Sequence, residues 1–131
     1  KDATGSLERA SMQRSKLGKD FILLSGDDST ALGFNAHGGH GCISVTANVA
    51  PRLCAQMQDA CTAGDFNTAR EINDKLVYLH RDLFMEPNPA PAKYVANRLN
   101  LCANEVRLPL VPISKPTQDA MDFAISHAGL I

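Results

Sequence analysis

The sequence has little of what marks nucleic-acid-binding or membrane-spanning proteins. Thirteen basic and fourteen acidic residues give a net charge of −1, so no surplus of positive charge could attract nucleic acid or an anionic membrane. Tryptophan is absent, and aromatic residues make up only 5% of the chain. No apolar run approaches the roughly 20 residues of a membrane-spanning helix. We therefore expect neither nucleic acid nor membrane among the partners.

The four cysteines follow no metal-binding or disulfide pattern. No CxxC pair occurs, and the spacings between cysteines and histidines match no zinc motif. Cys54 and Cys61 are seven residues apart, on one face of an expected helix, which suits small buried side chains. No secretory signal peptide is recognisable either. These features favour free structural thiols in a reducing, cytoplasmic setting.

What is present is an α/β pattern near the start of the chain. Residues 21–24 and 42–45 are short apolar runs rich in strand-favouring residues, and residues 28–36 between them are helix-like. A strand, helix and strand at this spacing predict two parallel strands in a covered sheet. Residues 1–6 resemble the loop after a further strand. Because a sheet of two strands makes a poor core, we expect the chain to be the later part of a longer protein.

The rest of the sequence predicts helices. One helix is expected from Ser6 to about residue 17, before the first strand, with Gly18 ending it. After residue 48 the spacing of apolar residues indicates helices only, and a proline-rich stretch at 86–91 interrupts them. Two prolines in residues 106–113 predict an extended loop rather than a strand. The expected helices after residue 48 cover 49–63, the region from 65 to the prolines, 92–100 and 114–128.

Several polar residues could carry chemistry, each with a structural alternative. Asp27 and Asp28 follow the first strand and could act as an acid–base pair or bind a metal, or Asp28 could cap the next helix. His37 and His40 could be metal ligands, or they could flank a glycine-rich turn. His80 is expected on the surface or at an interface.

Three further features complete the set of candidates. His127, like other helical histidines here, is expected on the surface or at an interface. Ser44, Thr46 and Asn48 alternate at the end of the second strand and could line a pocket. Gly26 has no side chain, so a ligand or another strand could approach its backbone closely.

Lys1 is the sharpest candidate. A lysine at the carboxyl end of a barrel strand can attack a carbonyl when burial lowers its pKa. The alternative is an ordinary solvated charge.

The sequence resembles a known enzyme family. Residues 1–5, KDATG, resemble the lysine loop of class I pyruvate aldolases. Four further stretches are similar to the dihydrodipicolinate synthase family within that group, namely residues 24–28, 38–48, 86–93 and 107–110. This resemblance implies the C-terminal part of a (β/α)8 TIM barrel followed by a C-terminal helical domain. It implies that residues 1–50 hold the last βα units and residues 51–131 the helical region.

The resemblance also implies an activity. Lys1 matches the lysine that forms a Schiff base, Ile43 the residue whose backbone carbonyl meets bound pyruvate, and Gly26 a backbone position that lines the same pocket. The implied reaction condenses pyruvate with aspartate 4-semialdehyde to 4-hydroxy-tetrahydrodipicolinate, in lysine and diaminopimelate biosynthesis, with no metal or organic cofactor. It also implies a cytoplasmic homotetramer. Neither Tyr78 nor Tyr94 matches the proton-relay tyrosines of the family.

The implied proton-relay tyrosines, paired threonines and carboxylate-binding arginine would belong to a missing N-terminal part of the barrel. Two alternatives remain open. One is a sister pyruvate-dependent aldolase, such as an N-acetylneuraminate lyase or a keto-deoxy-sugar acid aldolase. The other is a helical interaction module without enzymatic activity. The Schiff-base reaction implied by the resemblance requires the amine of Lys1 to be buried at the ends of two neighbouring strands, close to the carbonyl of Ile43.

Overall fold

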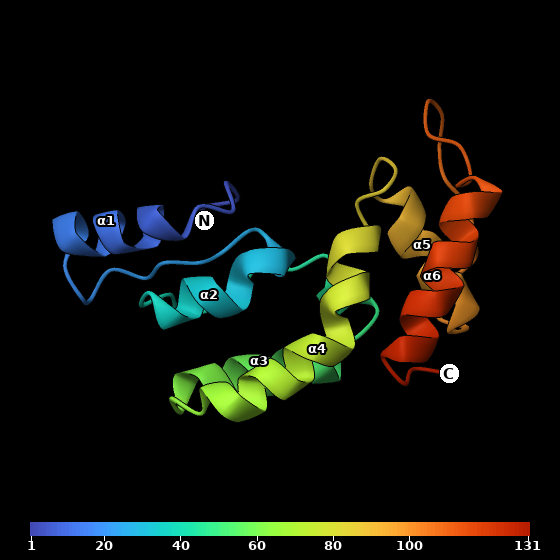
Figure 1. Ribbon diagram of the computed structural model, residues 1–131. Coiled ribbons are helices and arrows are strands. Elements are labelled where there is room, and N and C mark those ends of the chain that lie inside the picture. The colour runs from blue at the N-terminus through green and yellow to red at the C-terminus, as the bar shows by residue number, and fades with distance from the viewer. The chain divides into compact units, whose positions relative to one another are not determined.

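The computed structural model describes residues 1–131 and divides them into two compact units (Figure 1). The first unit comprises residues 1–44 and 52–74, and the second comprises residues 45–51 and 75–131. The chain contains six α-helices and two short 3-10 helices. None of its helices combines the length and the apolar character needed to cross a membrane.

The first unit is built from helices whose ends the sequence signals clearly. Helix α1 (Leu7–Leu17) ends at Gly18, which has a positive φ of 87°. The 3-10 helix η1 (Asp28–Thr30) leads into α2 (Ala31–Ala36). Helices α3 (Pro51–Thr62) and α4 (Phe66–Asp82) follow, and the backbone N–H of Thr68 donates to Asp65 Oδ1 at 3.1 Å. Asp65 therefore caps the start of α4 as predicted.

The expected strands are present only as single parallel bridges. Ser25 pairs with Asp2 on one side and with Cys42 on the other. The N–H groups of Asp2 and Gly26 donate to Leu24 O and Asp2 O, both at 2.8 Å, and the N–H of Ile43 donates to Ser25 O, also at 2.8 Å. The predicted parallel direction is confirmed, but the prediction of two regular strands is wrong because too few consecutive residues pair. Asp2, expected in a loop, is itself part of this pairing.

Apolar side chains fill one side of the paired segments. Leu23 is buried together with Ala10 and Phe34, and Leu7 packs against this cluster. Full burial of a leucine or phenylalanine side chain is worth about 1.5–3 kcal/mol. On the other side Ile22 and Ile43 are 61% and 52% exposed. The first unit therefore anchors its paired segments to α1 and α2 through one face only.

The second unit has a helical core. The 3-10 helix η2 (Thr46–Asn48), the later part of α4, α5 (Ala90–Arg98) and α6 (Lys115–His127) belong to it. Helices α5 and α6 lie side by side (Figure 1). Residues 106–113 form no helix or strand, as the prolines predicted. The largest fully buried apolar side chains of this unit are Leu76, Leu79, Leu83, Met121, Ile125 and Val95.

The placement of His80 corrects a sequence prediction. His80 is 2% exposed rather than at the surface, and its Nδ1 lies 2.8 Å from the hydroxyl of Thr46, which is fully buried. A polar pair of this kind stabilises a core when both groups find partners. His127, in contrast, is exposed. Its ring contacts that of Tyr78 edge-on, with 4.7 Å between the ring centroids.

Candidate active site

The side chain of Lys1 lies along the backbone of Gly26. A Cβ atom built on Gly26 would stand 2.4 Å from Lys1 Cε and 3.1 Å from Lys1 Cγ. No pair of real atoms adopts the shorter separation, so the lysine occupies the space that the missing side chain leaves free. The structure therefore brings together two of the three predicted site residues. Lys1 is nevertheless exposed within these 131 residues, which differs from the expected burial. The reason is that Gly26 and its neighbours cover the lysine side chain on one side only.

The backbone of Ile43 is hydrogen-bonded into the same set of paired segments. Its N–H donates to Ser25 O at 2.8 Å, so Ile43 follows the bridge between Cys42 and Ser25. The Ile43 side chain is 52% exposed. All three predicted site residues thus lie on adjacent parallel segments, each at or next to a bridge. Carboxyl ends of neighbouring parallel strands are where α/β enzymes hold their substrates.

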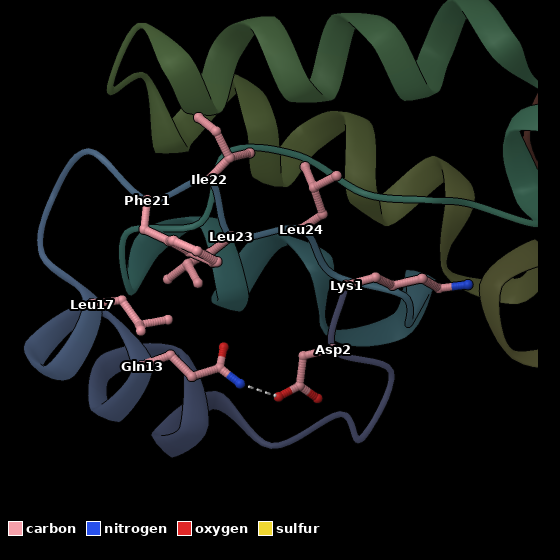
Figure 2. Close-up of a pocket in the computed structure, with 8 residues that line it drawn as sticks. All are labelled: Lys1, Asp2, Gln13, Leu17, Phe21, Ile22, Leu23 and Leu24. Carbon is pink, nitrogen blue, oxygen red and sulfur yellow. Dashed lines mark hydrogen bonds between the residues drawn. The ribbon is translucent and has the colours of Figure 1, made fainter.

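Asp2 fixes the segment that carries Lys1. Its carboxylate accepts hydrogen bonds from Thr4 Oγ1 at 2.6 Å, Thr4 N at 3.0 Å, Arg9 Nε at 2.7 Å and Gln13 Nε2 at 2.9 Å. Figure 2 shows the Asp2 carboxylate directed at Gln13 of α1 while the Lys1 side chain extends away from it. A pocket of about 150 Å³ next to this contact is lined by Lys1, Asp2, Gln13, Leu17 and residues 21–24.

Sequence reasoning missed this role of Asp2. The available signal was the placement of two side-chain donors, Arg9 and Gln13, four residues apart and hence on one face of α1. Which acid they bind could not be read locally, because the partner lies outside the helix. The hydrogen bonds from Thr4, followed by that from Arg9 and its positive charge, hold the pKa of Asp2 well below its usual range.

The lowered pKa of Asp2 predicts a pH-dependent contribution to stability. A carboxyl whose pKa is lower in the folded state stabilises that state above its unfolded pKa, which is about 3.9 for aspartate. The contribution is lost as the pH falls from there toward the folded value. Asp2→Asn is therefore expected to lower the melting temperature at neutral pH, and the difference from wild type should shrink below about pH 4.

Melting curves of the two proteins from neutral to acidic pH measure this effect. Asp20→Asn is a suitable control, because Asp20 is exposed and should show no such convergence. A difference between wild type and Asp2→Asn that stays constant down to about pH 2 would contradict the assignment.

The two aspartates after the first paired segment have different roles. Thr30 donates to Asp27 Oδ2 from its N–H at 3.1 Å and from its hydroxyl at 2.6 Å, so Asp27 caps the turn. The prediction that Asp28 is the cap is wrong. Asp28 is 3% exposed and accepts a hydrogen bond from the hydroxyl of Ser44. Local sequence could not separate two adjacent aspartates, since the choice depends on Ser44, sixteen residues away.

Two thiols lie close to this buried carboxyl. Burial, reinforced by the negative charge of Asp28, raises the pKa of Cys42 to about 12 and that of Cys54 to about 11. The thiolate is the reactive form of cysteine, so neither group is suited to act as a nucleophile near neutral pH. Cys102 is exposed, and all four cysteines are free.

A thiol reagent should therefore distinguish the cysteines. We expect Cys102 of the folded protein to react first, and Cys42 and Cys54 to react at least about a hundredfold more slowly, because Cys42 is half-buried, Cys54 is buried and both thiols stay protonated. Peptide mass mapping after timed labelling measures the order. Cys102→Ser should remove the fast phase, and unfolding in denaturant should make the remaining thiols react together. Labelling of Cys42 at the rate of Cys102 would contradict the prediction.

The two histidines of the glycine-rich turn do not share a site. His37 Nδ1 lies 2.8 Å from the hydroxyl of Ser11, whereas His40 Nδ1 accepts a hydrogen bond from the N–H of Leu23 at 3.1 Å. No group of three or more metal-binding side chains occurs in the chain. The hypothesis of a metal held by this pair therefore gains no support from their positions.

Known proteins resemble the chain over its whole length. It is 57% identical over 131 residues to the 4-hydroxy-tetrahydrodipicolinate synthase of Bartonella bacilliformis and 60% identical over 131 residues to that of Bartonella tribocorum. In both cases the match covers 100% of this chain and 45% of the relative. The chain thus spans a little under half the length of these curated relatives.

Solved structures of dihydrodipicolinate synthases also resemble the chain over nearly its whole length. The dihydrodipicolinate synthase of Aquifex aeolicus superposes with a TM-score of 0.93 at 38% identity, over 99% of this chain and 44% of its own. The chloride-inhibited enzyme of Acinetobacter baumannii, in complex with pyruvate, gives 0.94 at 36% identity, over 100% of this chain and 45% of its own. The model of the dihydrodipicolinate synthetase family matches residues 1–128. The chain therefore belongs to the dihydrodipicolinate synthetase family.

Proposed function

We propose that this chain supplies the Schiff-base lysine and part of the pyruvate pocket of a 4-hydroxy-tetrahydrodipicolinate synthase. The main structural support is the contact between Lys1 and Gly26, in which the lysine stem fills the space of an absent Cβ. Family membership and the identity to curated synthases support the same activity. The protein that holds these residues is then a lyase of lysine and diaminopimelate biosynthesis, with a (β/α)8 barrel completed by residues outside this chain.

Each predicted site residue has a distinct role in this proposal. The neutral amine of Lys1 is the nucleophile. Gly26 offers its backbone surface to the lysine stem and the keto acid. The carbonyl of Ile43, next in line after the bridge at Cys42, faces the bound pyruvate. Asp2 is a positioning residue, because its hydrogen bonds to Arg9 and Gln13 fix the backbone from which Lys1 extends.

The reaction follows from the chemistry of an amine and a keto acid. Lys1 attacks the ketone carbon of pyruvate, and water leaves as the imine forms. The imine withdraws electrons, so loss of a methyl proton gives an enamine. Its carbon forms a bond to the aldehyde carbon of aspartate semialdehyde. The amine of that substrate then attacks the imine carbon, which closes the ring and releases Lys1. Positioning of the reacting groups supplies much of the rate enhancement.

Covalent trapping tests the proposal. The native protein is incubated with pyruvate and borohydride, and the modified peptide is identified by mass spectrometry. We expect one reduced pyruvyl adduct, on Lys1 and on no other lysine. An unmodified Lys1, or an adduct on another lysine, would refute the assignment. Complete absence of adduct would favour the alternative of a helical interaction module.

Substrate choice separates this function from that of sister aldolases. The stretch from Gly39 to Asn48, which resembles dihydrodipicolinate synthases, favours aspartate semialdehyde as the second substrate. Turnover with aspartate semialdehyde, compared with cleavage of N-acetylneuraminate and of keto-deoxy-sugar acids, distinguishes the two functions.

We further propose that the native protein is a cytoplasmic homotetramer. Sedimentation of the native protein would test the number of subunits. Dimers or monomers at micromolar concentration would contradict the tetramer.

A further inference from the structure

A second hollow in the first unit lies outside the proposed reaction site. It has a volume of about 240 Å³ and is lined by Ser11, Arg14, Ser15, Lys19 and His37. None of the residues assigned to the reaction lines it. The volume is far above the roughly 30 Å³ of one water and below the ~300–1,000 Å³ of pockets for drug-sized ligands. A small polar ligand fits these dimensions.

Three of the lining residues come from one face of α1. Ser11, Arg14 and Ser15 are spaced by three and four residues, so their side chains neighbour one another. The hydroxyl of Ser11 lies 2.8 Å from His37 Nδ1, which ties α1 to the end of α2. Because Nδ1 is engaged by Ser11, a ligand can form a hydrogen bond only with the other ring nitrogen of His37, Nε2.

A glycine leaves room for the arginine. Gly38 has a φ of +96°, and a Cβ built on it would stand 2.7 Å from Arg14 Cδ and 2.9 Å from Arg14 Nε. Only glycine therefore allows both this backbone conformation and this path of the arginine. The stem of Arg14 thus passes over the backbone of Gly38, next to the turn that carries His37.

The charge of the hollow is of one kind. Two of the five lining residues, Arg14 and Lys19, are cationic, and no carboxylate lines the hollow. Neither of these two side chains takes part in an ion pair. Helix C-termini favour nearby cations, which accounts for a basic residue at the end of α1 or α2. It does not account for Lys19 and two hydroxyls around the same hollow.

We propose that this hollow binds a small phosphate-bearing anion. An arginine fork matches the geometry of phosphate oxygens, and hydrogen bonds from charged groups to such oxygens are strong. The Ser15 hydroxyl adds a donor of the kind that phosphate accepts, and the Ser11–His37 pair adds one more: Nε2–H when the Ser11 hydroxyl donates to Nδ1, or the Ser11 hydroxyl when Nδ1 donates to it. The ligand is inorganic phosphate or a phosphate monoester with a short carbon chain, since the volume leaves little room beyond the phosphate group.

Calorimetric titration of the native protein with inorganic phosphate and with glycerol 3-phosphate, at low ionic strength, tests the proposal. Arg14→Met keeps the stem that packs on Gly38 but removes the charge, and we expect it to weaken binding by about tenfold or more. Lys19→Met should also weaken binding. Lys16→Met is the matched control, because Lys16 lies on the same helix turn but does not line the hollow. It should change affinity by less than about twofold.

Competing outcomes are separated by these variants. Stronger binding of the monoester assigns the site to a phosphorylated metabolite, and equal binding assigns it to phosphate itself. No saturable binding of either probe, or equal weakening by Lys16→Met and Arg14→Met, would overturn the proposal, because the basic residues would then act only as diffuse surface charge. If Arg14→Met lowers the melting temperature markedly, Arg14→Lys replaces it and should weaken binding through loss of the fork alone.

Discussion

Replacement of Lys1 by arginine is expected to abolish covalent capture of pyruvate and to lower kcat/KM about a thousandfold or more, the scale on which loss of a catalytic nucleophile acts. Arginine keeps the charge and the long stem, but it stays protonated and cannot form an imine. The exposed stem of Lys1 makes no core contact that the folded state requires. We therefore expect the melting temperature to change little.

Steady-state turnover, borohydride trapping and a melting curve measured on the same preparation check this expectation. Lys16→Arg is the matched control, because Lys16 is also exposed and belongs to the same unit, and it should retain full activity. Wild-type amounts of adduct in Lys1→Arg would show that another amine captures the substrate. Equal loss of activity and of stability would instead point to a structural effect.

Gly26→Ala is expected to have the second-largest effect. Its new methyl group would stand 2.4 Å from Lys1 Cε and 2.8 Å from Ala3 Cβ. The lysine stem can move, but Ala3 Cβ moves only with its backbone, so the segment that carries Lys1 must shift and the amine is displaced with it. Misplacement of a reacting group by about 1 Å can lower the rate by about a hundredfold. We expect a loss of that order in kcat, together with slower trapping by borohydride.

A second glycine of the same unit provides the control. Gly33→Ala would place its Cβ 2.9 Å from Leu7 Cδ1, which is also an overpacked contact with a flexible side chain. It should cost some stability, typically about 1–3 kcal/mol for overpacking, and leave the rate of imine formation unchanged. If Gly33→Ala slows trapping as much as Gly26→Ala does, the effect reports general loosening. If Gly26→Ala is fully active, the close approach of Lys1 to Gly26 is irrelevant to catalysis.

The helical part of the fold was readable from local signals. Gly18 and Gly64 have φ values of 87° and 77° at helix boundaries. The apolar spacing after Asp65 matches the fully buried residues Ala69, Leu76 and Leu79 of α4 and Leu83 directly after it. These features depend on neighbours within a few residues, since helix caps and periodicity are local properties. Predicted bounds differ from observed ones by two residues at the starts of α3 and α5.

The polar residues near the site were less predictable. Asp27, rather than the expected Asp28, caps the turn, whereas Asp28 meets the hydroxyl of Ser44. His80 was expected at the surface or at an interface, but it is buried within the chain beside Thr46. The anchoring role of Asp2 depends on Arg9 and Gln13. Each of these outcomes is set by a partner distant along the chain.

The sequence by itself determined the helices, the parallel direction of the extended segments and the family, because each rests on short patterns of residues. The tertiary structure alone decided that Ser25 pairs with both Asp2 and Cys42, and that Lys1 follows the bare backbone of Gly26. These contacts join segments more than fifteen residues apart. Their geometry depends on how the chain packs, and no local preference encodes it.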